Sequence, residues 1–142
     1  MKTRAEILLV EDNANDLELM RRSFRHHRLA SALVVARDGV EALDYIFGSA
    51  DKAGTSHTPK VILLDLKLPR LDGVEVLRRL KADERTQKIP VIALIASEKD
   101  SERLKRDQLP VSGYLVKPVD FQNFARAVSK AGLDWMIAEA NS

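Results

Sequence analysis

Short runs of apolar residues alternate along the chain with segments in which apolar residues recur at helical spacing. Five of these runs are four to six residues long and are bounded by polar or turn-forming residues, which is typical of buried strands. Because helical segments separate the runs, the pattern predicts an α/β fold whose parallel sheet is covered on both faces. The predicted strands are residues 5–10, 32–36, 60–64, 90–95 and 113–116.

The helical segments each have apolar residues on one face. The predicted helices span residues 13–27, 38–48, 72–83 and 97–109, and a last helix begins near Asp120. In the first helix Leu17, Met20 and Phe24 recur at helical spacing, and in the second Val40, Leu43 and Phe47 lie on one side. In the third, Val74, Leu77 and Leu80 are expected to point inward. The segment 97–109 differs, because it is strongly charged and has only Leu104 and Leu109 as large apolar residues.

Composition fits one folded domain. The chain has 142 residues, of which 45% are hydrophobic and 31% charged, so it can bury an apolar core. Its 23 basic residues nearly balance 21 acidic ones, and a net charge of +2 does not favour nucleic-acid binding. The absence of cysteine excludes disulfides and thiolate metal sites. No stretch has the pattern of a signal peptide or the length of a membrane span, so we expect a soluble, cytoplasmic domain.

Charged side chains follow three of the predicted strands. Glu11 and Asp12 stand at the end of the first strand, Asp65 at the end of the third and Lys117 at the end of the fifth. In open parallel sheets the carboxyl ends of the strands form one edge, where ligands bind. Polar residues are normal where a single strand returns to water, but chance would seldom place all four at one edge.

The chemistry of these four residues favours a phosphoryl site with a divalent cation. Clustered carboxylates repel one another unless a cation lies among them, and Mg²⁺ prefers oxygen ligands together with phosphate. Lys117 adds a positive charge for a phosphoryl oxygen. A carboxylate can also act as a nucleophile and form an acyl phosphate, and Asp65 is the best placed for that attack.

At these residues the chain resembles the receiver domains of two-component response regulators. The similarity rests on "ILLVEDN" with its acid pair, on "VILLDLKLPRLDG" with Asp65, and on "GYLVKP" with Lys117, in matching order over nearly the whole chain. It implies a flavodoxin-like, doubly wound sheet with strand order 2-1-3-4-5. It also implies one receiver domain over 1–142, with a core of about 5–131 and a helical extension at 132–142. The polar loop after "LDYIFG" most resembles the stand-alone receivers that partner phytochrome-type histidine kinases.

The resemblance also implies a role for each site residue. Asp65 would accept a phosphoryl group from a kinase phosphohistidine, while Asp12, Asp65 and the backbone carbonyl of Lys67 would bind Mg²⁺. Glu11 would act mainly through bound water. Lys117 would contact the phosphoryl group and precede a cis bond to Pro118. Tyr114, three residues before Lys117, falls at the aromatic switch position. Phosphoryl uptake is then self-chemistry, and we do not expect a metabolic enzyme.

One position departs from the family pattern. Aligning Pro90 in "PVIALIAS" places Ile95 where the family has threonine or serine, whose hydroxyl binds the phosphoryl group. Isoleucine cannot donate a hydrogen bond. We favour a site that is still phosphorylated but switches less. Two alternatives remain: Ser97 supplies a substitute hydroxyl if the strand continues, or the domain no longer switches and docks constitutively. Whether Ile95 is natural or engineered does not follow from the sequence.

Remaining predictions concern partners. A histidine kinase is the expected partner, and the face formed by the fourth helix, fifth strand and fifth helix is expected to form a homodimer. In the C-terminal tail, Phe124, Val128, Ala131, Trp135 and Ala138 share helical spacing, and Trp135 suggests an interface.

The rival function is a phosphorylation-independent binding module. A flavin protein of like topology is less favoured, because no hydroxyl-rich loop follows the first strand.

Overall fold

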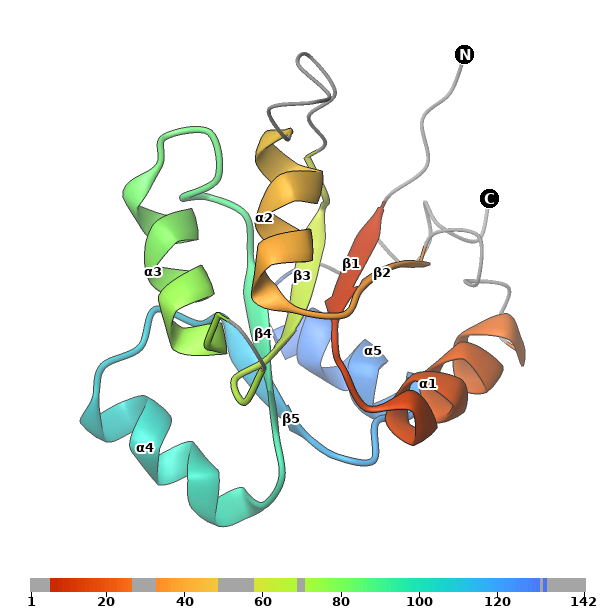
Figure 1. The fold of residues 1–142 in the computed structure, drawn as a ribbon. Coiled ribbons are helices and arrows are strands. Elements are labelled where there is room, and N and C mark those ends of the chain that lie inside the picture. Colours follow the sequence, from red (N-terminus) through yellow and green to blue (C-terminus); the bar gives the residue numbers. More distant parts are fainter. Residues whose placement is uncertain (1–5, 27–32, 49–57, 69–70, 131, 133–142) are drawn as a thin grey trace.

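Five parallel strands form one sheet in the computed structural model, which describes residues 6–26, 33–48, 58–68, 71–130 and 132 (Figure 1). The strand order is β2-β1-β3-β4-β5, as the resemblance implied. Register is continuous through the centre of the sheet, where Leu8 pairs with both Val34 and Ile62. The strands are β1 Ile7–Val10, β2 Leu33–Ala36, β3 Val61–Asp65, β4 Val91–Ile95 and β5 Gly113–Val116.

Helices cover both faces of this sheet (Figure 1). They are α1 Ala14–His26, α2 Gly39–Phe47, α3 Gly73–Ala82, α4 Ser101–Arg106 and α5 Phe121–Lys130. Two apolar clusters result: α1 and α5 pack on one face of the sheet, and α2, α3 and α4 on the other. Polar side chains cap the starts of α1 and α5. Asn13 accepts a hydrogen bond from the Asp16 backbone N–H, and Asp120 accepts one from the Asn123 backbone N–H.

The apolar side predicted for α2 is only partly buried: Leu43 and Phe47 pack against the core but keep part of their surface exposed. Val40 is 38% exposed, whereas Ala42 and Ile46 are buried. The helix is rotated because Gly39 lies against the backbone of Leu71: a Cβ at Gly39 would be 2.6 Å from the Leu71 carbonyl oxygen. Because Gly39 has no side chain, α2 can approach Leu71 closely at this position. Residues 42 and 46 lie on the same side of the helix as Gly39 and therefore face the sheet.

The charged segment after β4 is shorter as a helix than its pattern predicts. A 3₁₀ turn at Glu98–Asp100 precedes α4, which ends at Arg106. Strand β4 ends at Ile95, and Ser97 is exposed at the start of the turn. The condition for a substitute hydroxyl from Ser97, that the strand continues, is therefore not met.

The C-terminal end of α5 follows its pattern as far as the structure describes it. Phe124 and Val128 are buried, the helix ends at Lys130, and Gly132 has the left-handed φ of 77° that commonly follows a helix. The rest of the predicted extension, including Trp135, lies outside the described residues. No helix in the described part of the chain combines the length and apolar character that a membrane span requires.

Candidate phosphoryl and metal site

The carboxyl ends of β1, β3 and β5 bring the predicted site residues together. Glu11 directly follows β1, Asp65 is the last residue of β3, and Lys117 directly follows β5. One carboxylate oxygen from each of Glu11, Asp12 and Asp65 lies within 4.8 Å of the others. In the order β2-β1-β3, strand β1 lies between β2 and β3, so the strand order reverses direction at β1. Open α/β sheets bind ligands at the carboxyl ends of the strands beside such a switch point.

Burial divides the three carboxylates into two kinds. Glu11 is fully buried and Asp65 is 5% exposed, whereas Asp12 is exposed. The Glu11 backbone N–H donates to the Ala36 carbonyl, and its Oε1 accepts from the Asn13 N–H at 3.1 Å. Two carboxylates held with so little water require a positive partner, because burying an uncompensated charge is costly.

Lys117 is that partner in the structure. Its Nζ lies 2.6 Å from Asp65 Oδ2 and 2.7 Å from Glu11 Oε2, and only 19% of its side chain is exposed. The bond from Lys117 to Pro118 is cis, as the resemblance implied. One ammonium group thus bridges the acidic end of β1 and the tip of β3.

Asp16 is a member of this group that the sequence prediction missed. Its Oδ2 lies 3.4 Å from Lys117 Nζ, and it stands in the first turn of α1, four residues after Asp12. Asp12 lies outside α1, which begins at Ala14, so the signal for Asp16 in the sequence was only a carboxylate in the first turn of the helix that follows the acid pair.

Burial and charge act on the protonation of the site in opposite directions. Burial, together with the nearby charge of Asp65, raises the pKa of Glu11 from 4.5 to about 7, against the lowering effect of Lys117. For Lys117 itself, burial lowers the pKa, but the contacts with Asp65 and Glu11 outweigh this effect and raise it above the ordinary value. At neutral pH the site therefore has a firmly charged lysine beside a glutamate that can hold a proton.

This shift predicts a pH dependence of stability without divalent metal. Folded Glu11 has a pKa of about 7 and the ordinary value is 4.5, so between these values the folded state holds a proton that the unfolded state has lost. The free energy of unfolding, measured with urea in EDTA, should fall as pH rises through this window. The glutamine of Glu11→Gln cannot bind this proton, so in that variant the fall in the free energy of unfolding should be smaller by on the order of 2 kcal/mol. An identical pH profile in both proteins would contradict the assignment.

The turn after β3 fixes the tip of that strand. The Lys67 backbone N–H donates to Asp65 Oδ1 at 2.9 Å, and the Gly73 N–H donates to the Leu66 carbonyl at 3.2 Å. The start of α3 packs so closely here that a Cβ at Gly73 would lie 2.3 Å from the Asp65 carbonyl oxygen. Metal binding by the Lys67 carbonyl stays a prediction.

Ile95 faces the same site from the adjacent strand. It is 4% exposed and lines a small cavity of about 100 Å³. Asp65 and Lys117 form one side of that cavity, and the start of α4 forms another. The other lining residues are Lys67, Leu94, Ala96, Asp100 and Arg103. An apolar side chain thus occupies a wall of the space next to the Asp65 carboxylate.

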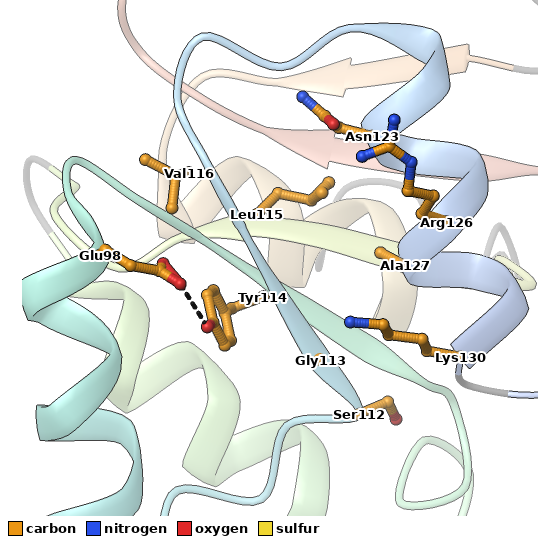
Figure 2. Close-up of a pocket in the computed structure, with 10 residues that line it drawn as sticks. All are labelled: Glu98, Ser112, Gly113, Tyr114, Leu115, Val116, Asn123, Arg126, Ala127 and Lys130. Atoms are coloured by element: carbon orange, nitrogen blue, oxygen red, sulfur yellow. Dashed lines mark hydrogen bonds between the residues drawn. The ribbon is translucent and has the colours of Figure 1, made fainter.

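Tyr114 lies on the far side of β4 from Asp65, in a second hollow (Figure 2). Its hydroxyl donates to Glu98 Oε1 at 2.7 Å, and this contact, above all, raises the pKa of Tyr114. Figure 2 shows the ring turned toward the 3₁₀ turn before α4. The hydrogen bond ties β5 to the segment that leads from β4 into α4. A switching role for Tyr114 stays a prediction.

The acidic group fits a divalent cation by its own chemistry. Three carboxylates supply the oxygen ligands that hard cations take, and the exposed position of Asp12 leaves room for the waters that such an ion keeps. The donor set favours a hard cation, but it does not by itself distinguish Mg²⁺ from Mn²⁺.

Comparison with known proteins decides the family. A model of the response regulator receiver domain matches residues 7–129. The chain belongs to this family. As a receiver domain, it is 37% identical over 130 residues to the probable methanogenesis regulatory protein FilR2 of Methanothrix harundinacea, a match that covers 92% of this chain and 83% of FilR2.

Solved structures of receivers resemble the fold closely. The bacteriophytochrome response regulator AtBRR is 41% identical, with a TM-score of 0.85 over 93% of this chain and 95% of that one. The Mn²⁺-bound form of response regulator Rcp1 is 29% identical, with a TM-score of 0.69 over 93% and 94%. The phosphorylated cyanobacterial phytochrome response regulator RcpA is 30% identical, with a TM-score of 0.71 over 99% and 98%.

Proposed function

We propose that this receiver domain accepts a phosphoryl group on Asp65 from a histidine kinase and signals through phosphorylation-dependent protein contacts. The observation that carries the proposal is the cluster of Glu11, Asp12 and Asp65 at the switch point of the sheet, with the ammonium of Lys117 on Glu11 and Asp65. A phosphorylated relative and a Mn²⁺-bound relative of the same fold support it.

The proposed roles are those that the resemblance to receiver domains implies. An Asp65 oxygen forms a bond to phosphorus while the phosphorus–nitrogen bond of phosphohistidine breaks, and the electron pair stays on the imidazole nitrogen. Asp12, Asp65 and the Lys67 carbonyl would hold Mg²⁺, with Glu11 acting through water. That ion would neutralise charge on the transferring phosphoryl oxygens. Lys117, already 2.6 Å from Asp65 Oδ2, would move its contact to a phosphoryl oxygen.

The direct test uses phosphoramidate as the donor. Wild-type protein incubated with Mg²⁺ and phosphoramidate should gain the mass of one phosphoryl group, and omission of Mg²⁺ should largely prevent the gain. Asp65→Asn should gain nothing, because an amide is a poor nucleophile for this step. An unmodified wild type, or a modified Asp65→Asn, would rule the proposal out.

The partner kinase is proposed to be of the phytochrome type. This rests on similarity to AtBRR at 41% identity and to RcpA. The expected cytoplasmic location goes with such a partner and stays a prediction. A pull-down of binding partners with wild type and Asp65→Asn separates the two candidate functions: a partner lost or gained with that change supports phosphorylation-dependent contact, whereas equal capture favours the constitutive module that Ile95 would permit.

We further propose that the face of α4, β5 and α5 forms a homodimer, as expected from the resemblance. That face has a hollow of about 360 Å³, and Figure 2 shows Arg126 and Lys130 on its α5 side and Glu98 on its α4 side. Opposite charges on the two sides suit pairing of two copies about a two-fold axis. Arg126→Glu should raise the concentration at which sedimentation detects dimers, and an unchanged value would count against this face.

A further inference from the structure

The cavity beside Asp65 lacks the hydroxyl donor that receivers usually place there, but it does not lack donors. Ile95 supplies an apolar part of its lining, and α4 contributes to the lining as well. Arg103 of α4 lines this cavity together with Asp65 and Lys117. A guanidinium therefore borders the same space as the phosphoacceptor and the site lysine.

Arg103 is held only weakly in its present contact. Its Nε lies 3.4 Å from Asp107 Oδ2, and the two side chains are 47% and 42% exposed. Surface pairs of this kind contribute little stability, because water screens the charges and the long side chains lose freedom. A stronger anion within reach of the guanidinium would therefore displace the contact with Asp107.

A phosphoryl group on Asp65 would be such an anion. It brings between one and two negative charges, as phosphorylation of side chains generally does, and three strong acceptor oxygens. Lys117 can meet one oxygen, and Ile95 can meet none. The planar fork of an arginine matches two phosphoryl oxygens at once, which a lysine cannot do.

We propose that Arg103 is a phosphoryl-binding residue that takes the place of the missing hydroxyl at position 95. The inference rests on the proposed phosphorylation of Asp65 and deepens it. In the phosphorylated protein the guanidinium leaves Asp107 and binds phosphoryl oxygens from the α4 side of the cavity. Phosphorylation then acts on α4 directly, rather than through a hydroxyl on β4.

Two other charged residues line the cavity and do not take this role. Asp100 carries the wrong sign, and its Oδ2 accepts a hydrogen bond from the Ser97 N–H at 3.3 Å, which keeps it in the turn. Lys67 has an exposed side chain on the turn after β3. Like any lysine, it presents a well-hydrated point charge and lacks a two-donor fork.

Arg106 provides a matched control on the same helix. Its Nε also approaches Asp107, at 3.5 Å from Oδ1, and its side chain is 72% exposed. It does not belong to the lining of the cavity. Arg103→Gln and Arg106→Gln therefore remove the same charge from α4 and differ in whether the lost guanidinium borders the site.

The test uses beryllofluoride, a phosphoryl analogue that binds the aspartate without a transfer reaction, in the presence of Mg²⁺. NMR titration gives its Kd for each protein, and intact mass gives the half-life of the phosphoryl group loaded from phosphoramidate. We expect Arg103→Gln to weaken beryllofluoride binding about tenfold or more, the loss of a hydrogen bond to a charged group. Arg106→Gln should stay within about twofold of wild type, since screened surface charges contribute little. Mg²⁺ affinity without beryllofluoride should not change.

A double-mutant cycle with Ile95→Thr sharpens the result. If Arg103 replaces the hydroxyl, the Ile95→Thr background already contains a substitute donor. Arg103→Gln should then lose less beryllofluoride affinity in the Ile95→Thr background than in the wild-type background. Equal Kd values and half-lives for Arg103→Gln and Arg106→Gln would overturn the inference while leaving phosphorylation of Asp65 intact. Wild-type protein that takes up neither beryllofluoride nor a phosphoryl group would overturn the proposed function and this inference together.

Discussion

Lys117→Met is expected to lower the free energy of unfolding by about 3 kcal/mol when urea unfolding is measured at pH 8 in EDTA, because removing one partner of a buried ion pair leaves an uncompensated charge. The ammonium lies within 2.7 Å of oxygens on both Asp65 and Glu11, and those side chains are almost completely buried. At pH 8 the Glu11 carboxylate is ionised, since even its raised pKa is about 7.

Mg²⁺ should restore most of that loss, because a divalent cation can neutralise the same carboxylates. The stabilisation that saturating Mg²⁺ produces should therefore be larger in Lys117→Met than in wild type. Lys99→Met serves as the control, since it removes an exposed lysine in the turn before α4 that has no role in the site. Equal gains from Mg²⁺ in wild type and Lys117→Met would show that the lysine and the metal do not share these acids.

Gly73→Ala is expected to destabilise the fold by about 3 kcal/mol, the upper part of the range for overpacking in a closed site. The new Cβ would lie 2.3 Å from the Asp65 carbonyl oxygen and 2.6 Å from Leu66 Cα. Both are backbone atoms at the tip of β3, so the clash cannot be relieved by a side-chain rotation. Either α3 or the tip of β3 must move.

Gly113→Ala is the matched control for Gly73→Ala. A Cβ at Gly113 meets nothing within 4 Å, and the position is in strand β5. We expect its effect on urea unfolding to be neutral or slightly stabilising, because alanine has less conformational freedom to lose. Similar stabilities for the two variants would mean that the packing of α3 against Asp65 tolerates the methyl group.

Hydrophobic pattern was sufficient to predict the sheet. All five strands lie within the predicted runs or extend them by one residue, because parallel strands covered on both faces must be apolar throughout. The inward face of α3 was also predicted correctly: Val74, Leu77 and Leu80 are buried. On α2 the same method succeeded only in part: Leu43 and Phe47 pack against the core, but Val40 is 38% exposed, and the close contact of Gly39 with Leu71 is one that apolar periodicity does not report.

Site residues at strand ends were easier to predict than those on helices. Topology alone brings Glu11, Asp65 and Lys117 to one edge, so their proximity follows once the sheet is predicted. Asp16 and Arg103 reach the site from α1 and α4, where their contacts depend on how each helix is rotated and where it begins. A helix as short and charged as α4 has too few apolar residues to fix that rotation from sequence.

The account depends most on a divalent cation bound by the acids at the ends of β1 and β3. The most direct measurement is an NMR titration of Mg²⁺ into wild-type protein and Asp12→Asn, followed through backbone amides. The account predicts saturable shifts in wild type, centred on Asp12, Asp65 and Lys67, and a large loss of affinity in Asp12→Asn. Shifts that do not saturate, or that spread evenly over surface acids and are the same in both proteins, would contradict it.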